Sequence, residues 1–293
     1  MIRELCLAAF ALVLGSGCSS HTEPTVPVDP ILELHARGGE LALAAEHRDQ
    51  AVDQFREGLA QARVRDDAAA IADLGFDLAV AQLQSGQPAA ALATAQETQA
   101  GLIRRGTEPI AELKLVEAIA LYRIGEPTAA DAAAAQVQSA GGPKTSSRAS
   151  FLRGLIADDR GDTAGLERAL GAIAATLGPE QQADAAELSA RLALRQGDIV
   201  GARAEALRAT NLRRDLLDYH SMARSLALAA RAAELANDTP NAADLYFRAG
   251  RTAAAENDAD SAKRWLRLAI ALSRDPSLTQ DAHSALTTVG EQQ

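Results

Sequence analysis

Apolar residues recur along most of the chain at intervals of three and four positions. In residues 74–82, for example, Leu74, Leu78 and Ala81 fall on one side of a helix, and residues 266–273 repeat the arrangement. This spacing is typical of an amphipathic α-helix whose apolar face is buried. The pattern therefore predicts a chain built mainly from helices.

Short turn signals separate these helical stretches, and each is centred on a marker residue that is glycine, asparagine or, once, glutamate. The markers are Glu46, Gly86, Gly125, Gly161, Gly197, Asn237 and Asn257. Glycine and asparagine readily take the left-handed backbone conformation that ends a helix. Successive markers lie 40, 39, 36, 36, 40 and 20 residues apart, so each full period predicts a helix hairpin. The halved last step predicts that one helix, over residues 241–256, serves two consecutive hairpins.

Small residues stand at fixed distances from these markers. Five positions after the marker are Ala51, Ala91, Ala130, Ala202, Ala242 and Ala262, with Leu166 as the exception. Seven positions before it are Gly39, Ala79, Ala118, Gly154, Ala190, Ala230 and Gly250. At both sets the chain resembles the tetratricopeptide-repeat (TPR) family, whose units are helix pairs with small residues at these places. The resemblance covers about residues 31–290.

The resemblance implies an all-α fold, a right-handed α-solenoid of antiparallel helix pairs. A generic all-α array with alanine-lined contacts is the alternative. In a solenoid each repeat touches only its neighbours, and the terminal repeats need a polar outer face. Residues 278–289, which carry polar side chains at intervals, suit such a closing helix.

The first residues follow a different pattern. Arg3 is followed by mostly apolar residues 5–14 and then by small residues up to Cys18, which are the three regions of an export signal. This run is too short to span a bilayer as a helix. The segment resembles a bacterial lipoprotein signal, in which such a cysteine receives lipid and becomes the new N-terminus. Ser16 and Gly17 match that signal, whereas Gly15 stands where leucine is usual.

We therefore expect a signal peptide over residues 1–17 and a lipidated, palmitate-bearing Cys18. The alternatives are an ordinary cleaved signal with an incidental cysteine, or a buried N-terminal helix. Residues 18–30 contain three prolines and no apolar pattern, which predicts an extended tether before a helical domain over residues 31–293. By resemblance, Ser19 after the lipidated cysteine favours the outer membrane, with the domain facing the periplasm.

Composition and charge narrow the function classes. The chain is 47% hydrophobic but only 3% aromatic, because alanine and leucine supply most of the apolar residues, and alanine favours closely packed helices. The net charge of −10, with no basic cluster longer than a pair, opposes binding to nucleic acid. If Cys6 leaves with the signal peptide, the mature chain has one cysteine and no internal disulfide.

Candidate catalytic and metal-binding residues form no known motif. The histidines His21, His35, His47, His220 and His283 lack metal-ligand spacing. The acidic pairs Asp66–Asp67 and Asp158–Asp159 and the turn at 258–260 are interpreted as helix caps. The RGD at 160–162 is interpreted as a repeat turn, and no phosphate-binding or nucleophile motif appears. We therefore expect no enzyme activity, no metal and no cofactor.

The aromatic residues are best explained as core residues, with one or two of them lining the concave face as anchors for a partner. They are Tyr122, Phe151, Tyr219, Tyr246, Phe247 and Trp265. The leading hypothesis is a membrane-anchored scaffold that binds a protein partner of the cell envelope on its concave surface. One alternative is a structural subunit of an envelope machine for pilus, secretion or outer-membrane assembly. Another is a helical cell-wall hydrolase.

Overall fold

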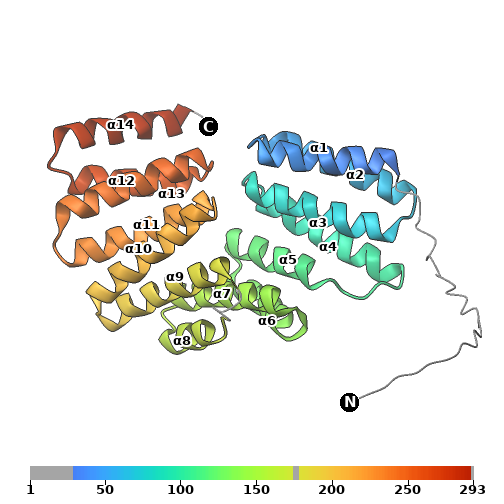
Figure 1. Ribbon diagram of the computed structural model, residues 1–293, viewed down its shortest axis with the longest axis horizontal. Helices are drawn as coiled ribbons and strands as arrows, with labels where there is room; N and C mark the ends of the chain where they lie inside the picture. Colours follow the sequence, from blue (N-terminus) through green and yellow to red (C-terminus); the bar gives the residue numbers. More distant parts are fainter. Residues whose placement is uncertain (1–28, 174–177, 292–293) are drawn as a thin grey trace, which may run out of the picture.

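The computed structural model describes residues 29–173 and 178–291, which consist of helices and short turns with no strand (Figure 1). The helices are α1 (Pro30–Ala44), α2 (Arg48–Val64), α3 (Ala68–Gln84), α4 (Pro88–Arg104), α5 (Ala111–Arg123), α6 (Pro127–Ala140), α7 (Pro143–Asp159), α8 (Thr163–Gly171), α9 (Pro179–Gln196), α10 (Ile199–Asp215), α11 (Tyr219–Leu235), α12 (Thr239–Ala255), α13 (Ala259–Leu272) and α14 (Pro276–Glu291). Cys18, His21 and the predicted signal peptide lie outside the described residues. None of the helices in the described ranges has the length and apolar character needed to cross a bilayer.

The turns between helices close in a common way. After α1, the N–H of His47 donates to the carbonyl of Ala42 at 2.8 Å, while Glu46 has a positive φ of 61°. After α3, Gln87 donates to Gln82 in the same manner, and Gly86 has a φ of 72°. These bonds satisfy carbonyls that a helix end leaves free. All seven predicted turn markers adopt the left-handed conformation, which confirms the hairpin prediction.

Three further turns have the same conformation and were not predicted. They are centred on Asp66, Gly106 and Leu217, with φ angles of 56°, 78° and 58°. With them included, left-handed residues follow one another every 19 or 20 positions from Glu46 to Gly125 and every 20 positions from Gly197 to Asn257. A step of 20 residues is therefore one helix and its turn. Helix α12 lies between the turns at Asn237 and Asn257 and packs on both α11 and α13, which confirms that one helix near the C-terminus serves two hairpins. The additional turns show that α12 is an ordinary member of this series.

The middle of the chain departs from this spacing. Helix α6 leads into α7 through Gly141 and Gly142, which are extended rather than left-handed. Helix α8 has only 9 residues, whereas α2–α4 and α10–α12 have 17 each. These two irregularities account for the two steps of 36 residues.

Small residues allow the helices to cross closely. Every residue of the two predicted sets of small positions, including the exception Leu166, is buried. A Cβ atom added to Gly39 would lie 2.5 Å from ring carbons of Phe55 on α2, and one on Gly250 would lie 2.7 Å from Cγ of Leu266 on α13. No larger side chain fits at these crossings without displacing its neighbour.

The helices form two curved layers. Each helix packs on the next, and the odd-numbered helices also contact one another in the series α1–α3–α5–α7–α9–α11. Among the even-numbered helices the corresponding contact is between α12 and α14. From α1 to α11 the odd-numbered helices are thus the more crowded, inner layer of a bent array. The predicted fold class, an all-α solenoid of antiparallel helix pairs, is confirmed.

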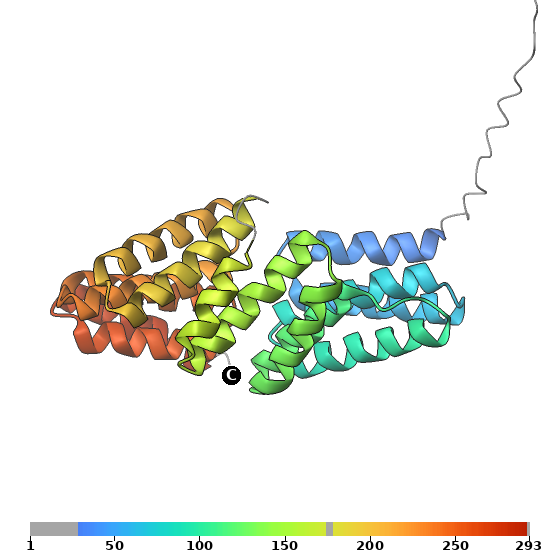
Figure 2. The same cartoon turned by 90° about the horizontal axis from the view of Figure 1, so that it is seen from below.

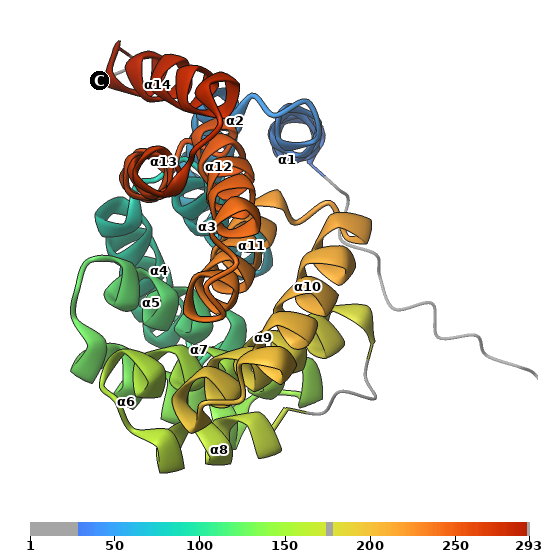
Figure 3. The same cartoon turned by 90° about the vertical axis from the view of Figure 1, so that its left-hand side faces the viewer.

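The bend brings the two ends of the described chain together. Helices α1–α4, the N-terminal arm, and α10–α14, the C-terminal arm, lie on either side of α5–α9, the bend (Figures 1 and 2). Figures 1 and 3 show α1 and α2 at the same end of the molecule as α13 and α14. Arg48 of α2 and Glu256, just after α12, join the arms through an ion pair of 2.7 Å.

Helix α14 closes the C-terminal end as the sequence predicts. Ala282 and Val289 are buried against the preceding helices, with 0% and 4% of their surface exposed. The outer side of the helix exposes Gln280, Asp281, His283, Thr287 and Thr288.

Candidate binding surface on the inner helices

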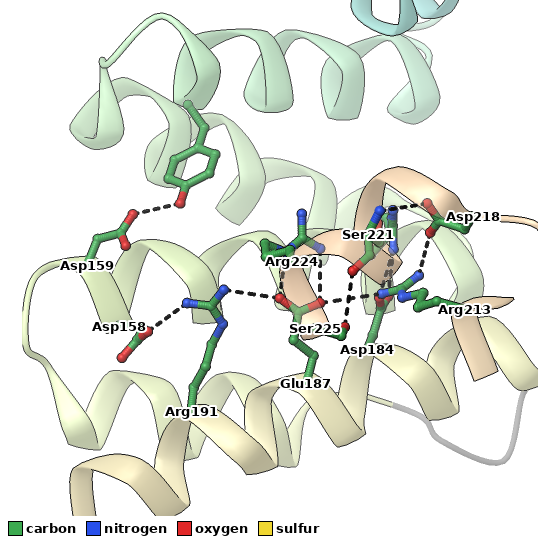
Figure 4. A network of polar contacts seen from close by, with 12 residues as sticks. Asp158, Asp159, Asp184, Glu187, Arg191, Arg213, Asp218, Ser221, Arg224 and Ser225 are labelled. Carbon is green, nitrogen blue, oxygen red and sulfur yellow. Dashed lines mark hydrogen bonds and ion pairs between the residues drawn. The ribbon is translucent and has the colours of Figure 1, made fainter. Parts of the chain in front are cut away.

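A network of charged side chains joins the inner helices of the bend to α11 (Figure 4). The centre of the network is formed by Asp184 and Glu187 of α9, whose side chains are both 0% exposed. Arginines from α7, α9, α10 and α11 surround these two carboxylates. Such groups remain ionised inside a protein only when they are paired and hydrogen-bonded.

Asp184 is held by two arginines. Nη1 of Arg148 on α7 donates to both carboxylate oxygens, at 2.7 and 3.0 Å. Arg213, near the end of α10, donates through Nη2 to the same carboxylate and has only 1% of its side chain exposed. Nη1 of Arg213 also reaches Asp218, at 3.0 Å, in the turn before α11. Asp184 therefore connects α7 to the α10–α11 turn.

Glu187, one helical turn further along α9, is held in a similar way. Arg224 on α11 donates to it in a two-point contact, Nε to Oε1 at 2.6 Å and Nη2 to Oε2 at 3.0 Å. Arg191 donates to Oε1 at 3.1 Å, and Nη2 of Arg213 lies 3.9 Å from Oε2. Burial by itself would raise the pKa of Glu187, but Arg224, Arg191 and Arg213 outweigh it and lower the pKa to about 2. Glu187 is therefore a fixed negative charge at the centre of the network.

The guanidinium groups also gather around one aromatic ring. The central carbons of Arg148, Arg213 and Arg224 lie 5.3, 5.6 and 5.6 Å from the ring centroid of Phe151 on α7. The ring is 4% exposed, whereas the side chains of Arg148 and Arg224 are 37% and 26% exposed. Cations at this distance are attracted to the face of an aromatic ring. The surface thus presents two arginines held in place from below by Phe151, Asp184 and Glu187.

The acidic pair Asp158–Asp159 forms the edge of this network. Asp158 accepts from Arg191 at 2.7 Å and from Nε of Arg195 at 2.5 Å. Asp159 accepts the hydroxyl of Tyr122 on α5 at 2.6 Å. Both carboxylates bind side chains of neighbouring helices, so the prediction that this pair caps a helix is wrong.

The other acidic turns agree with the sequence, except that Asp66 accepts from Nε of Arg105 at 2.7 Å instead of capping a helix. Asp67 caps α3 by accepting from the N–H of Ala70 at 3.0 Å, and Asp258 caps α13 by accepting from Ser261 at 3.1 Å. The RGD segment is a repeat turn, in which Gly161 is left-handed and Asp162 caps α8 through Gly165. In the described residues no three histidine, cysteine or acidic side chains gather in a way that would hold a metal ion.

The six aromatic candidates divide into two groups. Phe151, Tyr246 and Trp265 are buried, whereas Tyr122, Tyr219 and Phe247 are half-buried. Sequence reasoning missed the charged centre of the network, because Asp184, Glu187, Arg213 and Arg224 belong to no motif. The one hint is the three- and four-residue spacing of Asp184, Glu187 and Arg191 on α9, which puts their charges on one helix face.

The charges of Arg148 and Arg224 also act on Arg123 of α5. Arg123, at the end of α5, donates to the carbonyl of Leu83 at 2.6 Å, and its pKa is lowered by burial and by the charges of Arg224 and Arg148. Burial, together with Arg123 and Arg224, also lowers the pKa of His220 to about 4. His220 is therefore neutral at physiological pH.

The lowered pKa of His220 predicts that mild acid destabilises the protein. Between pH 6.5, the ordinary pKa of histidine, and about pH 4, the unfolded chain binds a proton at this residue that the folded chain does not bind. The stability that neutral His220 contributes above pH 6.5 is therefore lost as the pH falls from 6.5 to about 4. We expect the melting temperature to drop on acidification, and His220→Gln to reduce that drop. The exposed His283→Gln is the control, and an unchanged drop in His220→Gln would contradict the assignment.

Comparisons with known proteins bear on the fold. A scan against protein-family models and a search of curated proteins give no match. Among solved structures, a tetratricopeptide repeat protein from Parabacteroides merdae ATCC 43184 is 13% identical with a TM-score of 0.51, over 88% of this chain and 100% of that one. The C-terminal part of a TPR repeat-containing protein from Cytophaga hutchinsonii is 12% identical with a TM-score of 0.42, over 88% and 96%. The chain therefore has the fold of a tetratricopeptide-repeat protein.

Proposed function

We propose that the chain is a protein-binding scaffold that is anchored to a bacterial membrane by a lipid on Cys18 and binds its partner through the inner helices. The observation that carries the proposal is the pair of partly exposed arginines, Arg148 and Arg224, fixed over Phe151 on the inner layer. Arginine and aromatic side chains are enriched at the centres of protein interfaces. Because buried carboxylates already hold these arginines, little side-chain entropy is lost when a partner binds.

The anchoring part of the proposal is supported by the sequence. Cys18 follows an apolar signal, and Ser19 favours the outer membrane, with the domain facing the periplasm. A tether of extended, proline-containing chain adds about 3 Å per residue between the membrane and α1. Confinement to one membrane surface raises the effective concentration of any partner in the same compartment.

A second candidate function is supported by helix α1. One face of this terminal helix exposes three large apolar side chains, Ile31, Leu34 and Leu41, with exposed fractions of 46%, 67% and 71%. They lie three and seven positions apart and so form a stripe along the helix. Exposed apolar patches of this kind often mark permanent contacts. A structural subunit of an envelope assembly would cover this stripe, whereas a scaffold that binds its partner on the inner layer would leave it open.

Site-specific photo-crosslinking in living cells separates the two candidates. The crosslinking amino acid is placed at Tyr219 on inner helix α11, at Leu34 on the α1 stripe, or at half-buried Phe247 on α12. The scaffold predicts a discrete adduct from Tyr219, the subunit predicts one from Leu34, and Phe247 is the control. Adducts from Phe247 alone, or equal adducts from all three positions, would contradict both.

The same cells test the anchor. In the Cys18→Ala protein we expect lipid label to be absent and the chain to leave the membrane fraction. A Cys18→Ala chain that keeps both its label and its membrane association would exclude Cys18 as the anchor.

A further inference from the structure

The ion pair between Arg48 and Glu256 joins residues 208 positions apart. Arg48 is the first residue of α2, and Glu256 follows the last residue of α12. Their side chains are only 16% and 15% exposed, so the contact is shielded from solvent far more than a typical surface pair. Other inter-helix pairs of the structure, such as Arg148–Asp184, connect neighbouring repeats. This one spans the two arms.

The backbone on both sides of the contact is well defined. Arg48 comes two residues after left-handed Glu46, and Glu256 immediately precedes left-handed Asn257. The turn at Glu46 is closed by the bond from His47 to Ala42 at 2.8 Å, and the turn at Asn257 by a bond from Asp258 to Ala253 at 2.9 Å. Each partner is therefore presented by a hydrogen-bonded turn at the end of its arm.

Like charges surround the pair. Burial raises the pKa of Glu256, Arg48 opposes this rise, and the charges of Glu46 and Asp218 add to it. Glu46 belongs to the N-terminal arm, whereas Asp218 and Glu256 belong to the C-terminal arm. Without Arg48, nothing at this contact would oppose the repulsion of Glu256 by Glu46 and Asp218. Without Glu256, the contact would lose both the attraction to Arg48 and the repulsion from Glu46 and Asp218.

We propose that Arg48 and Glu256 form a latch that holds the two arms of the solenoid together, and that breaking it lets the arms move apart. In a solenoid each repeat contacts only its neighbours, so many small flexions add up to a large movement at the ends. A single contact between the ends removes that freedom. Because the bend lies between the arms (Figures 1 and 2), the latch also fixes how far apart the arms stand on either side of it. The latch goes beyond the proposed function and does not depend on what the partner is.

Because of these surrounding charges, removing Arg48 and removing Glu256 have different expected effects on the distance between the arms. Arg48→Ala removes the attraction and leaves Glu256 repelled by Glu46 and Asp218, so it separates the arms most. Glu256→Gln removes one of the repelling charges together with the attraction, so it separates them less. Exchanging the two charges, Arg48→Glu with Glu256→Arg, restores an opposite-charge pair.

The test measures the distance between the arms by pulsed electron spin resonance. Spin labels are placed on cysteines at two exposed positions, Gln50 on α2 and Asp260 on α13, in the full chain with Cys6 and Cys18 replaced by serine. We expect a single narrow distance with the latch intact, a longer and broader distribution for Arg48→Ala, a smaller shift for Glu256→Gln, and recovery of the short distance in the charge exchange.

A matched control is Arg56→Ala, which breaks an exposed ion pair with Asp53 within α2, where the side chains are 55% and 65% exposed. It should leave the distance unchanged. Circular dichroism checks that each variant keeps its helices. A folded Arg48→Ala protein with the original distance distribution would overturn the latch, as would an equal shift in Arg56→Ala or no recovery in the charge exchange.

Discussion

Replacing Asp184 with alanine is expected to lower the free energy of unfolding by about 4 kcal/mol. The change leaves Arg213, whose side chain is 1% exposed, without its closest buried carboxylate, and it takes from Arg148 its two-point contact. The loss comes mainly from the unpaired buried charge rather than from the lost attraction. Urea denaturation followed by circular dichroism measures it.

Two further variants separate this explanation from a general effect of losing an acidic residue. Asp244→Ala breaks an exposed pair with Arg248, in which the side chains are 51% and 55% exposed, and should change stability by less than about 1 kcal/mol. Arg213→Met combined with Asp184→Ala removes the stranded charge and should recover much of the loss. If Asp184→Ala costs no more than Asp244→Ala, the network does not support the fold in the way described.

Replacing Gly39 with leucine is expected to lower the free energy of unfolding by about 3 kcal/mol. Even a Cβ at this position would lie 2.5 to 2.7 Å from carbons of the Phe55 ring, which is itself 1% exposed and has no room to move. The crossing of α1 and α2 must therefore widen. Thermal unfolding is the measurement.

The neighbouring glycine is the control. A Cβ on Gly38 would meet only the flexible end of the Gln54 side chain, so Gly38→Ala should be tolerated, since alanine also favours a helix more than glycine does. Combining Gly39→Leu with Phe55→Ala should cost less than the sum of the two single changes, because the smaller side chain leaves space for the larger one. Equal losses from Gly38→Ala and Gly39→Leu would show that close helix crossing is not the reason for glycine at position 39.

Much of the fold could be predicted from the sequence, because each turn and each close helix crossing depends on one or two residues at a fixed position in the chain. Glycine and asparagine mark left-handed positions, and the periodic apolar residues mark buried faces. The missed turns at Asp66 and Leu217 have no such residue. Leucine pays a steric penalty in the left-handed conformation, and Leu217 is held there because the helices on both sides fix the chain, as the 2.9 Å bond from Asp218 to Arg213 shows.

The candidate surface was less predictable for a different reason. Asp184 and Glu187 look like the solvated charges of any helix, and their partners come from helices as far away as Arg224, 37 residues further along the chain. Only the packing of α7, α9 and α11 reveals that these charges are buried and paired. The prediction that Cys18 carries a lipid rests on a local motif. Because Cys18 lies outside the described residues, it stays a prediction.

The even spacing of the left-handed turns at 197, 217, 237 and 257 makes the C-terminal arm modular. A tandem duplication of residues 198–237 would insert one complete hairpin in frame, with its caps and its small crossing residues already in place. Such a lengthened chain would keep every local contact and yet carry Glu256 past Arg48. The proposed latch therefore depends on the number of helix hairpins that lie between Arg48 and Glu256.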